Sequence, residues 1–309
     1  MDKLGALIGR ALSARFAYRV VSSGLVSHPL LLLWQLDRFP KPSGRVTVSL
    51  KDHRALSFEL SDRTQRTMFL GLFEPNETRL VGELLGPGDT FVDVGAHVGW
   101  FTTLASQVVG SGLVESIEPF EASLALLKAN IDNNRCTNVR LRETAVGDEV
   151  GALQIAGSDS GGVTALEWRS LGQRVTVPVV RMDDLDISDE VSLMKIDVEG
   201  WEANVLRGGQ ATLSRTKNLL IEVSRGSLIK AGSSPEAIFG MLRDAGFTSF
   251  YRVTDGILRE RYLERRAPAR AQNVFATRTA VSPGADGRTL RGLSRRTLSH
   301  LRPLRPPRT

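Results

Sequence analysis

A short apolar strand that runs straight into glycines, at residues 90–99 (TFVDVGAHVG), constrains the fold of this chain more than any other segment. An amphipathic helix follows it, and a second apolar run ends on Glu118, twenty-five residues after Asp93. Strand, glycine turn and helix in this order let the backbone approach a ligand at the helix N-terminus. A carboxylate at the tip of the next strand can bind the hydroxyls of a ribose. The segment therefore predicts a parallel α/β sheet that binds a nucleoside.

The spacing of the glycines narrows the kind of nucleoside. Gly95 and Gly99 stand in the pattern G-x-x-x-G, whereas dinucleotide-binding folds use G-x-G-x-x-G. This spacing leaves less room for a pyrophosphate, and Asp93 already places an acid in the strand before the turn. We therefore expect a cationic nucleoside without phosphate, namely S-adenosylmethionine (SAM). The same spacing disfavours a nicotinamide oxidoreductase.

From residue 90 onward, apolar strand patterns alternate with helical patterns, which predicts a mostly parallel sheet with helices on both faces. One helix is expected at about 121–133, and another from Ser234 to Gly246, where an N-cap serine precedes a proline. The predicted strands are Thr90–Val94, Leu113–Glu118, Val139–Thr144, Val191–Asp197 and Asn218–Val223, with a closing antiparallel pair at Phe247–Val253 and Val274–Thr277.

Three further segments accompany this sheet. Alternating runs at Arg45–Leu50 and Ala55–Leu60 predict a β-hairpin, and a helix is predicted over residues 76–85 with Asn76 as its N-cap. Residues 150–180 interrupt the strand–helix alternation with two β-like runs around a stretch rich in glycine and serine. Because insertions beside a nucleotide site commonly build the substrate pocket, we expect this one to do so.

Carboxylates stand at the ends of four predicted strands: Asp93, Glu118, Asp197 and Glu222. Ligands of open α/β sheets bind at the carboxyl ends of the strands, and buried carboxylates are costly unless they are paired. We therefore expect this edge of the sheet to be functional. The alternative for each carboxylate is a structural role, in which it caps a helix or bonds to a loop.

The run from residue 193 to 202 carries Lys195, Asp197 and Glu199 in alternation with apolar residues, so that an extended chain turns all three charges to one side. A lysine in a central strand needs partners, which the nearby acids supply. We expect a polar network that positions or deprotonates a hydroxyl group. A buried ion network that only closes the sheet edge is the alternative.

Methyl transfer from SAM to an alcohol requires alignment of the two reactants and a base that takes the alcohol proton. The candidates for that base are Asp197, Glu199, Glu222 and His97, which lies inside the glycine turn. Upstream, Glu74 and Glu77 are expected to fold over the amino-acid end of SAM. Glu77 alternatively suits the first turn of a helix, where the helix dipole favours an acid.

Charge and composition limit which other functions the chain can have. The 309-residue chain has a net charge of +6, and residues 279–309, with seven arginines and one aspartate, account for all of it. A neutral body disfavours binding of nucleic acid, and binding through the arginine-rich tail is the alternative. The single Cys136 excludes an intramolecular disulfide, and the four histidines show no metal-binding spacing, so no metal is expected.

The two ends of the chain differ in character from the middle. Residues 1–40 predict a helical arm that packs on the domain or on a second copy of the chain. Residues 4–36 could instead lie on a membrane surface as a basic amphipathic helix, since no apolar run is long enough to span a bilayer. We expect disorder beyond residue 280 and a cytoplasmic location. The expected division is an arm at 1–40, a hairpin lead-in at 41–72, a catalytic domain at 73–278 and a tail at 279–309.

Five motifs in order along residues 73–250 resemble the FkbM family of SAM-dependent methyltransferases. These motifs are Phe91–Phe101, Ile117–Pro119, Asn138–Gly147, Met182–Leu185 and Met194–Glu202. The resemblance implies a Rossmann-like class I methyltransferase fold. It also implies O-methylation, often of sugar or polyketide hydroxyls in natural products, glycolipids or surface glycans.

The resemblance also implies where SAM is bound. It places Asp93, Gly95, Ala96 and Gly99 at the methionine part of SAM, Glu118 at the ribose, and Ala145 and Val146 near the adenine. The family usually has asparagine where this chain has His97, whose imidazole can replace an amide donor.

The leading hypothesis is therefore a SAM-dependent O-methyltransferase that acts on a hydroxyl of a sugar, a glycolipid or a secondary metabolite. One alternative is a catalytically inactive scaffold that binds SAM. The other is a nucleic-acid-binding protein that acts through the arginine-rich tail. Association into a homo-oligomer is compatible with the sequence.

Overall fold

The computed structural model describes residues 44–157, 163–164, 174–254, 257–260 and 271–279. The predicted arm at 1–40, with the proposed membrane contact at 4–36, lies outside the described residues, as do residues 280–309 of the predicted tail. Among the described helices, none has both the length and the apolar character that a bilayer crossing requires.

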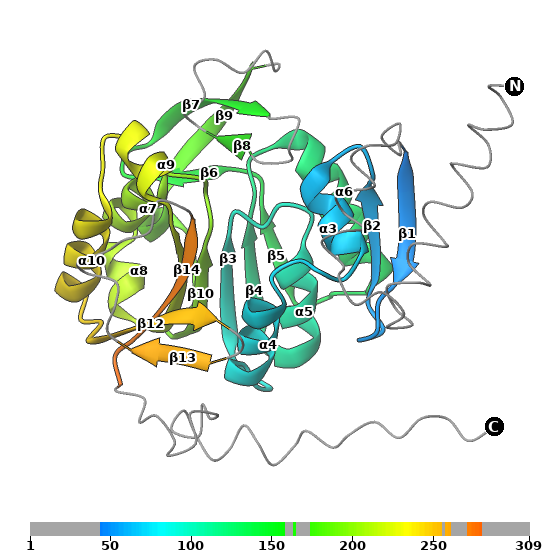
Figure 1. Ribbon diagram of the computed structural model, residues 1–309, viewed down its shortest axis with the longest axis horizontal. Helices are drawn as coiled ribbons and strands as arrows, with labels where there is room; N and C mark the ends of the chain where they lie inside the picture. The colour runs from blue at the N-terminus through cyan, green and yellow to red at the C-terminus, as the bar shows by residue number, and fades with distance from the viewer. Residues whose placement is uncertain (1–43, 158–162, 165–173, 255–256, 261–270, 280–309) are drawn as a thin grey trace, which may run out of the picture.

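An eight-stranded sheet forms the centre of the molecule (Figure 1). Its strands, in spatial order, are β13 (Ile257–Glu260), β12 (Ser249–Thr254), β14 (Gln272–Thr277), β11 (Thr216–Val223), β10 (Val191–Ile196), β3 (Thr90–Val94), β4 (Leu113–Ile117) and β5 (Val139–Arg142). The five strands from β11 to β5 are parallel, which confirms the predicted doubly wound sheet.

The antiparallel end of the sheet is larger than predicted. The expected antiparallel pair is present as β12 and β14, and β14 also inserts between β12 and β11 and runs antiparallel to both. The strand β13 adds a further antiparallel partner to β12, which the sequence did not predict. The prediction of a single closing pair was therefore incomplete, because pairing between strands depends on register that a sequence pattern does not specify.

Alternate residues of the central strands enter two separate cores. Phe91 and Leu193 face the core shared with α4 (Pro75–Leu84) and α5 (Trp100–Val109). Val92 and Met194 face the core shared with α7 (Glu202–Gly208), α8 (Gln210–Ser214) and α10 (Pro235–Asp244). Figure 1 shows these two groups of helices on opposite sides of the sheet. The alternation follows from the two-residue period of a strand.

Most predicted helices have the bounds that the structure gives them. The helix α6 spans Glu121–Asn133 as predicted. The helix α10 begins after Ser234, whose side chain accepts the Ala237 N–H, and Gly246 follows it with φ +91°. The shorter α9 spans Arg225–Lys230.

The start of α4 differs from the prediction. The predicted N-cap, Asn76, lies inside the helix, whereas Glu74 occupies the N-cap position with φ +40° and Pro75 takes the first helical position. Proline suits that position because its missing N–H would have no helical partner there. The predicted N-cap was wrong because it relied on the residue type of Asn76. Pro75, one residue earlier, already marks the first helical position.

The predicted hairpin is present as β1 (Arg45–Ser49) and β2 (Ala55–Glu59), and α3 (Arg63–Phe69) follows it. Asn130 of α6 ties the hairpin to the domain, because its side chain bonds to the backbone N–H and C=O of Ser57 and to the Val98 carbonyl. The sequence did not predict α3, which is one of the elements that border the cavity described below.

The interruption at residues 150–180 forms a second sheet. Its strand order is β6 (Ala145–Gly147), β9 (Arg174–Arg181), β7 (Gly151–Gly157) and β8 (Val163–Thr164), and a short 3-10 helix (Met182–Asp184) follows β9. The two predicted β-like runs correspond to β7 and β9, which pair antiparallel. This small sheet continues from β5, so it stands next to the carboxyl ends of the central strands (Figure 1).

Candidate active site

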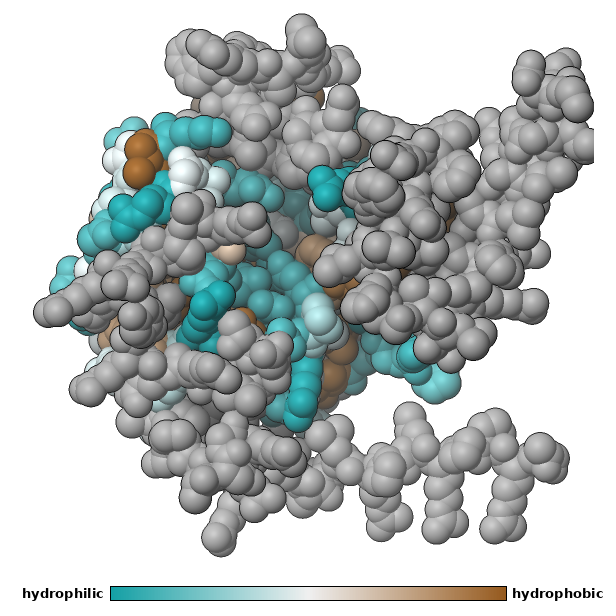
Figure 2. Space-filling model, viewed as in Figure 1, coloured by the Kyte–Doolittle hydropathy of each residue, from teal (hydrophilic) through white to brown (hydrophobic). Residues whose placement is uncertain are grey.

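A cavity of about 300 Å³ lies where the topology of the main sheet reverses. From β3 the chain continues to β4 and β5 on one side of the sheet. The later strands β10 and β11 lie on the other side of β3. Ligands of open α/β sheets bind in the crevice that such a reversal leaves beyond the carboxyl ends of the strands. In Figure 2, which has the same view as Figure 1, the middle of the molecule is hollowed and its coloured residues are mostly hydrophilic.

The glycine turn after β3 forms the floor of this cavity. Gly95 has φ +86°, and a Cβ atom at this position would lie 1.9 Å from the Asp197 carbonyl oxygen. Only glycine therefore lets the turn close onto the end of β10. The N–H groups of Gly95 and Ala96 both donate to the carbonyl of Ile117, which fixes the turn against β4.

His97 continues the turn in the left-handed region, with φ +51°. Asparagine, aspartate and histidine tolerate this region better than most side chains, so histidine is compatible with this backbone conformation. The imidazole lines the cavity. Burial lowers the pKa of His97, against the opposing effect of Asp62 and Asp197, so the ring is neutral near pH 7.

Glu118 stands at the tip of β4 as predicted, and its carboxylate holds two loops together. One oxygen accepts the His97 N–H at 2.8 Å, and the other accepts the Phe120 N–H at 2.9 Å. Burial raises the pKa of Glu118 to about 7, although these two hydrogen bonds favour its charged form. Since a carboxylate has about four acceptor sites, both oxygens retain capacity for ligand hydroxyls.

Asp93 and Lys195 are register partners on β3 and β10, and they lie on the sheet face that carries α5. The Thr102 hydroxyl donates to Asp93 at 2.6 Å. Burial raises the pKa of Asp93, while Lys195 and Thr102 oppose that shift. The Lys195 ammonium lies 4.9 Å from the centre of the Phe101 ring, a favourable distance for a cation–π contact.

Lys195 forms the polar network that its spacing predicted. Its Nζ atom donates to Asp197 Oδ2 at 2.7 Å. Burial by itself disfavours the ammonium, but Asp197, Glu74 and Asp93 outweigh burial and raise the pKa of Lys195. Lys195 is therefore charged and bound by its neighbours.

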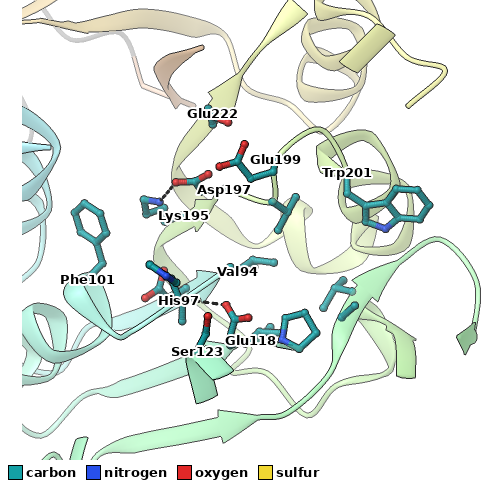
Figure 3. Close-up of a pocket in the computed structure, with 18 of the residues that line it drawn as sticks. Val94, His97, Phe101, Glu118, Ser123, Lys195, Asp197, Glu199, Trp201 and Glu222 are labelled. Carbon is teal, nitrogen blue, oxygen red and sulfur yellow. Dashed lines mark hydrogen bonds and ion pairs between the residues drawn. The ribbon is translucent and has the colours of Figure 1, made fainter. Parts of the chain in front are cut away.

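Glu199 lies in the turn beyond β10, with φ +54°, rather than on the strand itself. The prediction that a continuous extended chain points it beside Lys195 was wrong in its geometry, because β10 ends at Ile196. The turn nevertheless returns Glu199 to the cavity, and Figure 3 shows it beside Asp197. Backbone in sparsely populated regions collects at functional sites, and Glu74, His97 and Glu199 all line the cavity with positive φ.

Glu222 lies near the end of β11, at the side of the cavity opposite Glu118 (Figure 3). Its Oε2 atom is buried and has no hydrogen-bond partner among the described residues. Burial raises the pKa of Glu222 to about 10, and repulsion from Asp197, Glu199 and Glu202 adds to the shift. Its register partner on the neighbouring strand β14 is Asn273.

Glu74 reaches the cavity from the loop before α4. The Asn273 side chain donates to Oε1 of Glu74 at 3.4 Å and of Glu77 at 3.1 Å, while Glu74 Oε2 is buried without a partner in the described chain. Burial raises the pKa of Glu74 to about 7, and Lys195 opposes the shift. Glu77 is buried in the first turn of α4, which matches the structural alternative for that residue, and it does not line the cavity.

Apolar side chains cover the end of the cavity below the small sheet. Ala145 and Val146 line it from the start of β6, and Leu153 and Ile155 line it from β7. Trp201 closes the same end, and its indole N–H is buried with no partner in the described part of the chain. The insertion therefore borders the cavity, and its role in a substrate pocket stays a prediction.

Gly99 does not line the cavity. It is the N-cap of α5 with φ +87°, and a Cβ atom there would lie 2.6 Å from Cδ1 of Leu127 in α6. The structure therefore explains this glycine by its backbone conformation and by the close packing of α6.

Several lining residues were missed by the sequence analysis. They are Thr64, Met68, Phe73, Trp100, Phe101 and Ser123. The first two belong to α3, which carried no motif, so nothing in the sequence tied them to a site. The ring of Phe73 lies 5.9 Å from that of Trp100 and 6.3 Å from that of Phe101. Trp100 and Phe101 end the motif Phe91–Phe101, and Phe73 directly precedes Glu74.

The cavity is strongly acidic. Its lining includes six carboxylates against the single ammonium of Lys195: Glu74, Asp93, Glu118, Asp197, Glu199 and Glu222. Within the described residues, no three or more metal-ligating side chains are grouped so that they could hold an ion. The acidic lining favours a cationic ligand with hydrogen-bond donors, and the glycine turn lets such a ligand approach the backbone.

Comparison with known proteins was made at the level of sequence and of structure. A curated relative, 31-O-demethyl-FK506 methyltransferase FkbM from Streptomyces tacrolimicus, is 29% identical over 203 residues, which cover 54% of this chain and 75% of the relative. Solved structures with similar folds include a SAM-dependent O-methyltransferase from Thermotoga maritima, with 14% identity, coverage of 82% of this chain and 83% of that chain, and a TM-score of 0.41.

A putative methyltransferase from Streptococcus mutans, solved with S-adenosylhomocysteine (SAH), is 11% identical and covers 65% of this chain and 94% of that chain, with a TM-score of 0.40. The decisive match is to a family model, the methyltransferase FkbM domain, over residues 93–249. That range is just over half of the chain and runs from the last residues of β3 to the start of β12. The chain belongs to the FkbM methyltransferase domain family.

Proposed function

We propose that this protein is a SAM-dependent O-methyltransferase that transfers a methyl group to a hydroxyl of a sugar, a glycolipid or a secondary metabolite. One observation carries the proposal: the cavity at the sheet reversal has the Glu118 carboxylate, which we assign to the ribose, at one end, and at the other a buried Glu222 oxygen without a partner among the described residues. The FkbM relative is a 31-O-demethyl-FK506 methyltransferase, which supports oxygen as the atom that is methylated.

Three parts of the lining support SAM as the ligand. Glu118 suits the ribose hydroxyls, because both of its oxygens are fixed by backbone N–H groups and keep free acceptor capacity. The apolar surface of Ala145, Val146 and Leu153 suits the adenine. The buried Oε2 atom of Glu74, which has no partner among the described residues, suits the ammonium of the methionine part.

SAM supplies a methyl group that is already activated by a positively charged sulfur. The protein must therefore align the acceptor oxygen with that methyl, exclude water and remove one proton. Lys195 and Phe101 hold Asp197 and the methionine side of the cavity in place. Asp197, Glu199, Glu222 and His97 all line the cavity and remain the candidates for the base.

The methyl acceptor is proposed to bind next to the small sheet. Because β7 brings Leu153 and Ile155 to the cavity wall, this sheet is the element that we propose to contact the acceptor. An acceptor rich in hydroxyls suits the acidic lining better than an acceptor that carries phosphate or carboxylate groups, which the carboxylates would repel.

Incubation of the purified protein with methyl-labelled SAM and extracts of lipids and glycans tests the function. We expect label in a product that resists mild alkali, as an ether does and an ester does not. Asp197→Asn should lower the transfer while the affinity for SAM stays within about threefold, because the ion pair with Lys195 is lost but the ribose and methionine contacts remain.

The alternatives give different results in the same assay. An inactive scaffold binds SAM but transfers no label to any extract. A nucleic-acid-binding protein shows salt-dependent affinity for nucleic acid that disappears when residues 279–309 are deleted. An oxidoreductase binds a reduced nicotinamide cofactor and not SAM in calorimetry.

A further inference from the structure

We propose, on the basis of the function proposed above, that Glu222 faces the transferable methyl and accepts the proton of the acceptor hydroxyl. The sequence left four residues open for this role. Among the four, Glu222 is distinguished by a buried acceptor atom that has no hydrogen-bond partner in the described residues.

Three other carboxylates of the cavity are engaged within the protein. Asp197 is held by the Lys195 ammonium, and Asp93 accepts the Thr102 hydroxyl. Glu118 uses both oxygens to hold backbone N–H groups on either side of the crevice. A carboxylate that already neutralises a lysine is a weaker proton acceptor than one that lies among other acids.

Glu222 differs because its Oε2 atom is buried and without a partner among the described residues. An unpaired buried acceptor is costly unless a ligand supplies the missing donor. Glu74 Oε2 is in the same condition, but Glu74 reaches the cavity from the loop before α4, whereas Glu222 lies beyond the Lys195–Asp197 pair (Figure 3). An acceptor hydroxyl placed between the donor and β11 would donate to Glu222.

Charged and polar groups face Glu222 from each element packed beside it. They are Lys195 from β10, Asp197 and Glu199 from the loop after β10, Glu202 from α7 and Asn273 from β14. The acids outnumber the lysine, so the proton affinity of Glu222 is high and its pKa is raised to about 10. A positively charged sulfur in the cavity favours the ionised carboxylate, which can then act as a base.

The proposed step balances as follows. The acceptor oxygen forms a bond to the methyl carbon, and the bond from that carbon to sulfur breaks with its electron pair left on sulfur. The acceptor O–H proton passes to Glu222, so the products are the methyl ether, the neutral thioether SAH and a protonated Glu222. The proton passes to solvent when the next SAM binds, because the positively charged sulfur favours the ionised carboxylate.

Binding of two donor analogues tests where Glu222 points. Sinefungin carries a protonated amine at the position of the transferable methyl, whereas SAH carries nothing there, and both share the ribose, adenine and methionine groups. If Glu222 faces the methyl, the wild-type protein binds sinefungin at least about tenfold more tightly than SAH by calorimetry. In Glu222→Gln this ratio falls to within about threefold, while the affinity for SAH changes by less than about twofold.

Glu199→Gln is the matched control, because Glu199 is a neighbouring acid of the same cavity. It should keep the preference for sinefungin, and the unfolding temperature of each variant shows that the fold is intact. An equal loss of both ligands in Glu222→Gln places Glu222 at the methionine ammonium and overturns the proposal. The proposal is also overturned if the ratio of sinefungin affinity to SAH affinity stays unchanged in Glu222→Gln. It is overturned as well if only Glu199→Gln loses the preference for sinefungin.

Methyl transfer gives a second, independent readout. In the labelled-extract assay at saturating SAM, Glu222→Gln should lower the rate by at least about a hundredfold. Transfer at the wild-type rate overturns the proposal even if the sinefungin preference is lost. If the wild-type protein binds neither SAH nor sinefungin, the proposed function itself fails, and that result differs from every outcome above.

Discussion

At the scale of single residues, Asp93 is one of the acids that stabilise the Lys195 ammonium in the cavity. It lies beside Lys195 in the sheet register and accepts the Thr102 hydroxyl. Asp93→Asn keeps the shape but removes the charge, so the affinity for SAM should fall by more than about tenfold in calorimetry. Asp89→Asn, at the other end of β3, is the control and should leave the affinity unchanged. An unchanged dissociation constant in Asp93→Asn would contradict the assignment of the site.

Glu118 should make the affinity of the cavity for a nucleoside depend on pH. A ligand without the amino-acid part of SAM can measure this dependence separately. The pKa of Glu118 is about 7 in the empty protein, and ribose hydroxyls bind best to the ionised form. The affinity for 5′-methylthioadenosine, which lacks the amino-acid part of SAM, should therefore rise with pH through about 7 and level off above about 8. Glu118→Gln should bind the probe more weakly and without this rise. The same pH slope in that variant would show that another group is responsible.

At the scale of elements, the glycine turn and the end of β10 form one unit. Gly95→Ala would place a Cβ atom 1.9 Å from the Asp197 carbonyl oxygen at φ +86°, so the turn or the strand end must move. We expect the variant to lose SAM binding and to unfold at a lower temperature than the wild-type protein. Gly82→Ala in α4 is the matched control, because it has open space and no positive φ there, and it should be neutral or slightly stabilising. Wild-type affinity in Gly95→Ala would contradict the close approach.

The elements also show what a sequence pattern can predict. Strands β3, β4, β10 and β11 were predicted to within two residues, because each is an apolar run bounded by turn residues. The helix α3 and the strand β13 were not predicted, and the N-cap of α4 was misplaced. These elements are short, and their conformation depends on the sheet and helices that they contact more than on their own residue pattern.

At the scale of the whole molecule, buried acids in the cavity and next to it destabilise the empty protein as the pH rises. The pKa values of Glu74, Glu118 and Glu202 are raised to about 7, and that of Glu222 to about 10. The folded state therefore binds more protons than the unfolded state between the ordinary carboxyl pKa and these values. Stability contributed by the neutral forms is lost as the pH rises through this range.

We accordingly expect the unfolding temperature of the ligand-free protein to fall between about pH 6.5 and 8. His97 does not mask the effect, because its pKa is lowered and its contribution changes only at lower pH. Calorimetry at several pH values should show a smaller fall for Glu222→Gln, since the amide does not ionise. A wild-type unfolding temperature that rises over this interval would show that the buried acids do not control stability.

The sequence by itself determined the class of the fold and the position of the crevice. A strand that runs into Gly95 and a carboxylate at the next strand tip are local patterns, and local patterns survive in any chain that buries its apolar faces. The same local patterns predict Asp93, Glu118, Asp197 and Glu222 at one edge of the sheet.

Only the tertiary structure decided how those charges are shared. Lys195 neutralises Asp197 and not Glu222 because of strand register, and Asn273 lies beside Glu222 because β14 inserts next to β11. Register and insertion are set by packing between segments far apart in the chain, so no local pattern contains them. The proposed chemistry depends on the Glu222 oxygen that has no partner in the part of the chain that the structure describes, and the assembled sheet creates that condition.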